Sequence, residues 1–256
     1  MKKSLLAIAL TACISMITPA HAFDYGYIAD NYFYTYQIDN VVQKDLVKNQ
    51  RKYGTGYSKA KNSTKKSNST SNKQAQTKKT HTDHYSPSSS VTSTINNEMI
   101  ASMRQSLQSQ GKLNADNQQN LNYLANANLI TQVKQALKSD GYEPNSVATA
   151  MAFWVVVNYG ISQGQDLSTL KAHGMVSQLK DALAEDLAGM SNADKQRMAE
   201  TLYWHGFLQM MVYLEAVQQN NQSAINVRVR EANKGLSSMG ISASNIKHGS
   251  RGLEFR

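Results

Sequence analysis

From Val91 to the C-terminus, hydrophobic residues recur with the spacing of amphipathic α-helices. A first helix is predicted by four residues at intervals of four: Ile95, Met99, Met103 and Leu107. A second helix is predicted by five further positions: Leu121, Leu124, Ile130, Val133 and Leu137. It ends at "SDGYEP", because Gly141 is suited to a left-handed cap and Pro144 to the first turn of the next helix.

Two later stretches are hydrophobic around most of their circumference, which is typical of helices buried on all sides. The first is "VATAMAFWVVVNYGISQG", which begins at Val147 and contains Trp154. The second covers about residues 199–217 and contains Trp204 in a broad apolar stripe. We expect these two to be the central helices of a bundle, with both tryptophans buried.

Shorter amphipathic stretches predict the remaining helices. A fourth helix covers about residues 176–187, and Ser191 and Asp194 then have the spacing of a capping box for the fifth. A sixth helix is predicted over about residues 225–236; "INVRVR" also alternates as a strand would, but the neighbouring "EANKGL" favours a helix. One short turn and an extended tail follow, held by three apolar residues: Ile246, Leu253 and Phe255.

The pattern therefore predicts an all-α fold, with a single helical bundle of five to six helices over residues 91–256. About 165 residues are ample for one hydrophobic core. We expect a fragment that begins near Val91 to fold on its own and to resist proteases.

The first 22 residues have the layout of a secretory signal peptide. Lys2 and Lys3 precede the apolar stretch "LLAIALTACISMI", and a small-residue site ends at Ala22. We expect cleavage after Ala22, a periplasmic or secreted protein, and no transmembrane span in the mature chain. The alternative is a lipoprotein, because "LTAC" looks like a bacterial lipobox that would make Cys13 the lipidated first residue.

Residues 23–47 form an aromatic-rich N-terminal segment with a net charge of −3. Seven of the fourteen residues from Phe23 to Tyr36 are Phe or Tyr. Aromatic side chains at this density predict docking onto a surface, which is the segment's own domain or a protein or cell-envelope partner. The candidate partner-binding residues are Tyr25, Tyr27, Tyr32, Tyr34 and Tyr36.

Residues 48–90 carry ten basic residues and one acidic residue, whereas residues 91–256 have a net charge of only +1. This segment is rich in Ser, Thr, Asn and Lys and poor in aliphatic residues, which predicts a disordered linker. A soluble tether is the favoured interpretation. The alternative is a basic arm for envelope polymers, lipids or, least favoured, nucleic acid. Its candidate contacts are Lys59, Lys61, Lys65, Lys66, Lys78 and Lys79.

Few residues stand in catalytic or metal-binding patterns. Cys13 is the single cysteine, so a chain cleaved after Ala22 forms no disulfide and no thiolate metal site. H-E-x-x-H and phosphate-loop motifs do not occur. We therefore expect no cofactor, no metal and no catalysis. The alternative is a periplasmic hydrolase or transferase with a site formed by scattered helix residues such as Asp181, Glu200 and His205.

Three stretches resemble a group of exported bacterial proteins known only as a domain of unknown function: "VATAMAFWVVVNYGISQG", "SNADKQRMAETLYWHGFLQMMVYLEAVQQNN" and "INVRVREANKGLSSMGIS". The resemblance covers about residues 95–256. It consists of packing features and implies no functional residue. Taken together, the sequence predicts an exported, non-enzymatic helical interaction module with a tethered aromatic N-terminal segment.

Overall fold

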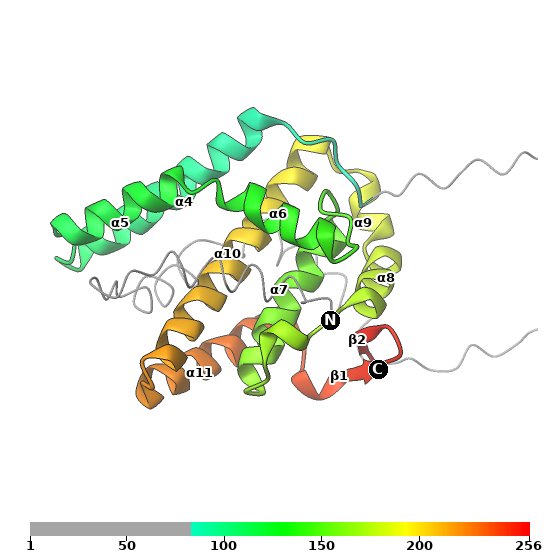
Figure 1. Cartoon of the computed structure of the whole chain (residues 1–256). Helices are drawn as coiled ribbons and strands as arrows, with labels where there is room; N and C mark the ends of the chain where they lie inside the picture. The colour runs from blue at the N-terminus through cyan, green and yellow to red at the C-terminus, as the bar shows by residue number, and fades with distance from the viewer. Residues whose placement is uncertain (1–82) are drawn as a thin grey trace, which may run out of the picture.

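The computed structural model of the protein describes residues 83–256, and these form a helical domain (Figure 1). Its eight α-helices are α4 (Ser89–Ser109), α5 (Ala115–Asn126), α6 (Leu129–Ser139), α7 (Val147–Ser162), α8 (His173–Ala182), α9 (Ala184–Ala188), α10 (Asn192–Gln218) and α11 (Gln222–Ser238). The predicted all-α class is confirmed. The predicted signal peptide, the aromatic segment and most of the predicted linker lie outside the described residues.

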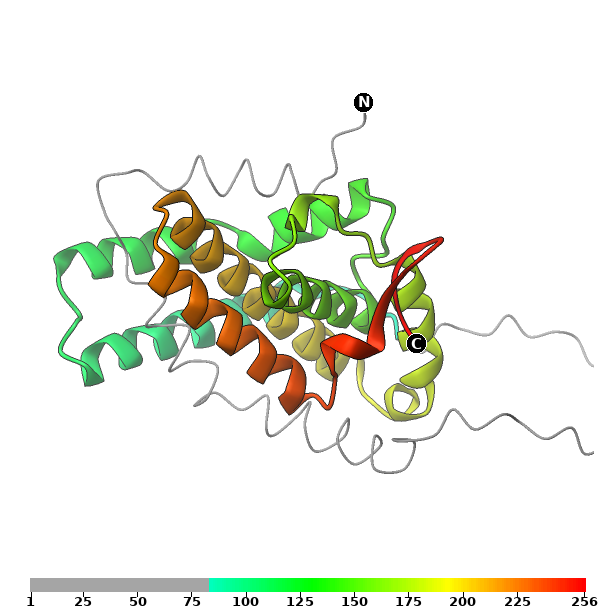
Figure 2. The same ribbon diagram turned by 90° about the horizontal axis from the view of Figure 1, so that it is seen from below.

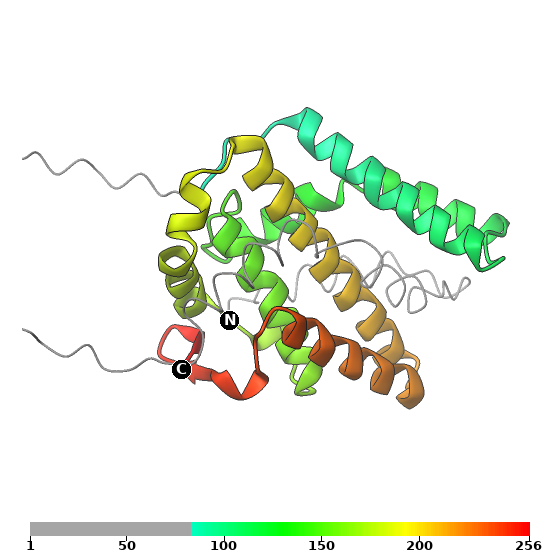
Figure 3. The ribbon, with the colours of Figure 1, turned by 180° about the vertical axis from the view of Figure 1, so that it is seen from behind.

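Helices α7 and α10 form the centre of the domain, as the sequence predicts. Every residue of α7 except Ser162 is buried, and α11, α8 and α10 pack around it. Helix α10 also contacts α4 and α6 (Figures 1 and 3). Gly206 permits the close approach of the two central helices, because a Cβ atom there would lie 2.6 Å from the Phe153 ring.

Both tryptophans are buried, which confirms the prediction from their helices. Trp154 has no exposed surface and Trp204 is 1% exposed. The indole N–H of Trp204 donates to Oδ1 of Asn96 at 2.8 Å, which ties α10 to α4. The predicted stripe of α4 also faces the core, since all four of its apolar residues are buried.

Side-chain caps fix where the central helices begin. The hydroxyl of Ser146 accepts from the Thr149 N–H at 3.1 Å at the start of α7. The hydroxyl of Ser191 accepts from the Asp194 N–H at 3.1 Å at the start of α10 and donates to Oδ2 of Asp194 at 2.6 Å, so the predicted pair of residues caps this helix.

Two of the six predicted helices are interrupted, which accounts for the eight that are seen. The second becomes α5 and α6, because Asn128 takes a left-handed backbone conformation with φ of 47°. The fourth becomes α8 and the short helix α9, with Leu183 between them. Helix α11 includes "INVRVR", so the choice of helix over strand is confirmed there.

The expected short turn is present at residues 243–245, and the expected extended tail after it folds back on itself as a two-stranded antiparallel hairpin. Strand β1 (Ile246–Gly249) pairs with β2 (Gly252–Phe255), and the hairpin packs against α8 (Figure 2). Leu253 is fully buried, and its N–H donates to the Lys171 carbonyl at 2.6 Å. Gly252 has φ of +92°, and a Cβ there would lie 2.4 Å from the Lys171 oxygen, so this turn requires glycine.

Helices α4 and α5 form a hairpin that projects from one end of the domain (Figures 1 and 3). The main packing partner of α5 is α4, through Leu121 and Leu124. Within residues 83–256, no helix is long and apolar enough to cross a membrane.

Candidate functional site

The helical domain begins at Asp83, eight residues before the predicted boundary at Val91. Residues 83–88, which we call the root segment, cross the beginnings of α7 and α10. The Val147 N–H donates to the Asp83 carbonyl at 2.9 Å, and the Tyr85 N–H donates to the Asn145 carbonyl at 3.0 Å. Asp83 and Tyr85 are only 2% and 5% exposed. The sequence assigns these residues to the linker because its average composition is polar.

Amide side chains of α10 hold the second half of the root segment. The side chain of Asn192 accepts from the Ser86 N–H at 2.6 Å and donates to the Ser86 carbonyl at 2.7 Å. Gln196 makes the same pair of bonds with Ser88, each at 2.8 Å. Each amide thus satisfies one backbone donor and one backbone acceptor, as a neighbouring β-strand would.

A buried ion pair lies beside the root segment. The ammonium of Lys134 on α6 donates to Oε1 of Glu200 on α10 at 2.6 Å. The same carboxylate oxygen accepts from Thr92 at 3.1 Å and from Gln196 at 3.0 Å. Glu200 has no exposed surface, so the two hydrogen bonds and Lys134 compensate at Oε1 for the water that the carboxylate loses, whereas Oε2 is buried without a hydrogen-bond partner within residues 83–256.

Two tyrosines complete this cluster. Lys134 Nζ lies 5.1 Å from the centroid of the Tyr85 ring, a cation–π distance. The hydroxyl groups of Tyr85 and Tyr203 both donate to the Pro144 carbonyl, at 3.5 and 2.9 Å. Burial raises the pKa of both hydroxyl groups above the usual tyrosine value, and the charge of Glu200 raises it further. These tyrosines therefore stay neutral and act as hydrogen-bond donors.

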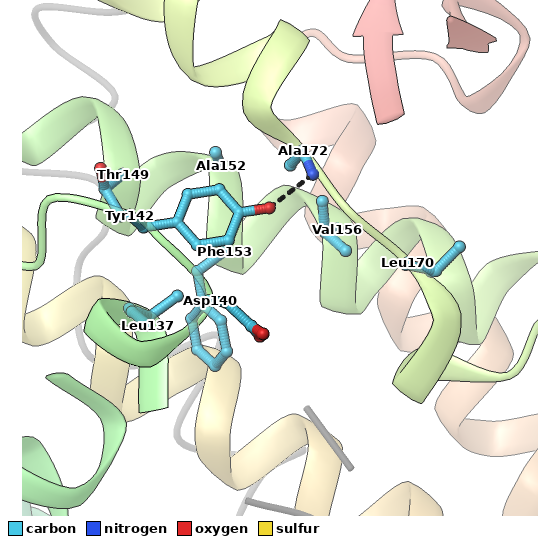
Figure 4. Close-up of a pocket in the computed structure, with 9 residues that line it drawn as sticks. All are labelled: Leu137, Asp140, Tyr142, Thr149, Ala152, Phe153, Val156, Leu170 and Ala172. Carbon is cyan, nitrogen blue, oxygen red and sulfur yellow. Dashed lines mark hydrogen bonds between the residues drawn. The ribbon is translucent and has the colours of Figure 1, made fainter. Parts of the chain in front are cut away.

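A small pocket lies between α6, α7 and the segment that leads into α8 (Figure 4). Its volume is about 30 Å³, which is room for roughly two water molecules. Tyr142 is its central polar residue, and its hydroxyl accepts from the Ala172 N–H at 2.8 Å (Figure 4). This volume is too small for an organic substrate, and the Tyr142 hydroxyl holds the segment that leads into α8 in place.

His173 stacks on the Tyr142 ring near this pocket, with the ring centroids 4.1 Å apart and an angle of 15° between their planes. Burial lowers the pKa of His173, and the charge of Lys171 lowers it further. A neutral imidazole can be partly buried against the Tyr142 ring at little cost, because it has no charge that must be removed from water.

The three residues of the enzymatic alternative do not form one open site. Glu200 and His205 are fully buried within α10, whereas Asp181 is exposed on α8. Burial lowers the pKa of His205 to about 4, so it is neutral at physiological pH. The arrangement that would favour a hydrolase, with His205 and a carboxylate exposed and facing each other, is not found in residues 83–256.

The other predicted contacts lie outside the described part of the chain. This holds for the five tyrosines of the aromatic segment and for the six lysines of the linker. Within residues 83–256, no group of three or more His, Cys, Asp or Glu side chains is placed to hold a metal ion. The root segment and its polar cluster were missed from the sequence, although Tyr85 among polar residues was a signal that could have revealed them.

The fold and these contacts define a class of protein. It is a mainly α-helical domain with a packed core, and the root segment at its N-terminal end is hydrogen-bonded to the starts of α7 and α10. The chain belongs to a family of unknown function (DUF6683), whose profile matches residues 1–256. The family match thus extends beyond the region of the resemblance. No curated protein and no solved structure shows significant similarity to the chain.

Proposed function

We propose that this protein is an exported, non-enzymatic interaction module. Its helical domain is a rigid platform, and the aromatic segment, residues 23–47, is a tethered recognition element that docks on the domain itself or on a protein partner. The layout of residues 1–22 supports export, and the aromatic composition of residues 23–47 supports docking.

The observation that carries the proposal is the anchored root segment. Backbone hydrogen bonds to the α7 start and paired amide bonds from Asn192 and Gln196 fix residues 83–88 to the domain. The residues before Asp83 therefore leave the domain from a defined point. A tether with a fixed origin keeps its recognition element at a high local concentration around the platform.

The polar residues of the domain support the same interpretation. Glu200, the carboxylate that a scattered catalytic site would use, is bonded to Lys134, Thr92 and Gln196 in the interior. These bonds connect α4, α6 and α10 at the root, which is a structural role.

Affinity capture with two matched variants tests the proposal. One variant replaces the five candidate tyrosines of the aromatic segment by Ser, and the other replaces the six candidate lysines of the linker by Gln. We expect the tyrosine variant to lose the partners that the unaltered chain captures from its host's cell-envelope extract, and the lysine variant to retain them. Loss in the lysine variant alone, with capture that weakens steeply as salt is raised, would instead favour the basic-arm alternative.

A further inference from the structure

The root segment lies against the helical domain as a bound peptide would. Its groove, which we call the root groove, is formed by Asn145, Ser146 and Val147 at the start of α7 and by Asn192 at the start of α10. His84 pairs with Ser146 as an isolated antiparallel β-bridge, and the amide of Asn192 bonds one N–H and one carbonyl of the root segment. Backbone contacts of this kind bind an extended chain through its N–H and C=O groups, so the root groove has the properties of a peptide-binding site.

Two side chains of the root segment occupy specific places in the groove. The carboxylate of Asp83 accepts from the Ser146 hydroxyl at 2.5 Å, and this aspartate is 2% exposed. The ring of Tyr85 is buried, and its hydroxyl donates to the Pro144 carbonyl at 3.5 Å. The residue between them is only half-buried, and Ser86 after them is exposed. The groove therefore selects an Asp and a Tyr two positions apart and accepts other side chains beside them.

The same spacing of Asp and Tyr occurs once in residues 1–82. Residues 30–33 read "DNYF", which aligns with "DHYS" at residues 83–86. Their Asp and Tyr match the two buried side chains of the root segment. Phe33 falls at the exposed position, so its size is no obstacle there. None of the four residues is proline, so each has the N–H and C=O groups that the groove bonds.

We propose that residues 30–33 are a second ligand of the root groove and compete there with residues 83–86 of the same chain; this rests on the proposed function. When residues 30–33 bind, the aromatic segment is stored on its own domain, and when residues 83–86 bind, it is free for a partner. The same chain is favoured over a second copy, because residues 34–82 tether the second ligand to the groove at an effective concentration in roughly the millimolar range.

The position of the root segment in the chain explains why it occupies the groove in this structure. Only Pro87 and Ser88 separate residues 83–86 from the first residue of α4, so their ends are already held close to the groove. Residues 30–33 have the longer tether and therefore the higher entropic cost of binding. A substitution that weakens the root segment shifts the groove toward residues 30–33, which makes the competition measurable.

Thermal denaturation of a chain that begins at Phe23 tests the competition. Tyr32→Ser alone should change the melting temperature by less than about 2 °C, because residues 83–86 already fill the groove. In the background of Tyr85→Ser, the same Tyr32→Ser substitution should lower the melting temperature by about 5 °C, because no tyrosine is then left to enter the groove. The matched control is Tyr25→Ser, which lies in the same segment but lacks the spacing to Asp and should have no effect in either background.

Two results would overturn the inference. One is a Tyr32→Ser substitution without effect in the Tyr85→Ser background, and the other is an equal loss from Tyr25→Ser. A loss that depends on protein concentration would also overturn it, because it would place residues 30–33 in the groove of a second copy. Tyrosine-dependent capture of a partner would in each case leave the proposed function standing.

A second pair of substitutions applies if the Tyr85→Ser chain does not fold. Asp83→Ala removes the bond to Ser146 and leaves the buried ring in place. Asp30→Ala should then lower the melting temperature in the Asp83→Ala background and not in the natural root, whereas Asp24→Ala should be without effect in both. An Asp30→Ala substitution that behaves like Asp24→Ala would contradict the competition.

Discussion

Glu200, a buried carboxylate in the core, is held through one of its oxygens by an ion pair with Lys134 and by hydrogen bonds from Thr92 and Gln196. The carboxylate has no exposed surface and lies 2.6 Å from the ammonium. From the sequence alone Glu200 is a possible catalytic group, because hydrophobic periodicity does not show which side chain will pair with a buried charge. The packing of α6 against α10 decides that, and it is a tertiary property.

The first prediction concerns this pair. Lys134→Met should lower the free energy of unfolding by about 3 kcal/mol, because it leaves a buried carboxylate without its counter-charge. Adding Glu200→Gln should recover most of the loss, since a neutral amide still accepts from Thr92. Urea denaturation of the single and double variants measures both effects.

The matched control is Lys247→Met, which breaks a surface pair with Glu254 at 3.4 Å. It should cost less than about 1 kcal/mol. A Lys134→Met variant as stable as this control would show that the buried pair contributes little.

The second prediction follows from His205. Its pKa is about 4 in the fold against 6.5 for a free imidazole, so the unfolded chain binds more protons between these values. Stability from this group is fully present above pH 6.5 and is lost as the pH falls toward 4. Between pH 7.5 and 5 the natural protein should lose about 2 kcal/mol more than a His205→Gln variant.

Urea titrations at the two pH values measure this difference. His248→Gln, which alters an exposed histidine in β1, is the control and should follow the natural protein. If His205→Gln loses stability with the same slope as the natural protein, the protonation of His205 is not the cause.

At the scale of elements, the apolar helices were the most predictable features. Helix α7 is hydrophobic on all sides and α10 has a broad apolar stripe, so both helices are stable only when they are buried at the centre of the domain. The break at Asn128 and the hairpin at Gly252 depend on single residues in unusual backbone conformations, so periodicity gives no warning of them. The root segment was missed for a different reason. Most of its hydrogen bonds are made by its own backbone groups, so they require no regular spacing of hydrophobic residues in the sequence.

The third prediction replaces the expectation for a fragment that begins at Val91. Such a fragment lacks the buried ring of Tyr85 and the hydrogen bonds of Ser86 and Ser88. Loss of a buried aromatic side chain alone costs about 3 kcal/mol. We therefore expect the fragment from Val91 to melt about 10 °C below one that begins at Asp83.

Thermal denaturation followed by circular dichroism compares the two fragments. The fragment from Asp83 should melt within about two degrees of a chain that begins at Phe23, because the root segment is intact in both. Equal melting temperatures for the Val91 and Asp83 fragments would show that the root contacts do not stabilise the domain.

At the scale of the whole molecule, the domain and the preceding residues have separate roles in this account. The domain supplies a packed core and the anchored root segment, and we propose that the aromatic segment supplies recognition. The domain's fold class, its central helices and its buried tryptophans could be predicted from the sequence. The candidate site could not, because its partners come from four regions distant in the chain and are brought together by packing.

The most direct test of the central claim is photo-crosslinking in the native host from position 34, with p-benzoylphenylalanine in place of Tyr34. The account predicts crosslinks to a discrete target, either the protein's own helical domain or one partner protein, and their loss when the other four candidate tyrosines of residues 23–47 are replaced by Ser. The same residue in place of Tyr57, in the linker, should give no discrete product. Equal, diffuse crosslinking from both positions would contradict the claim that the aromatic segment is the recognition element.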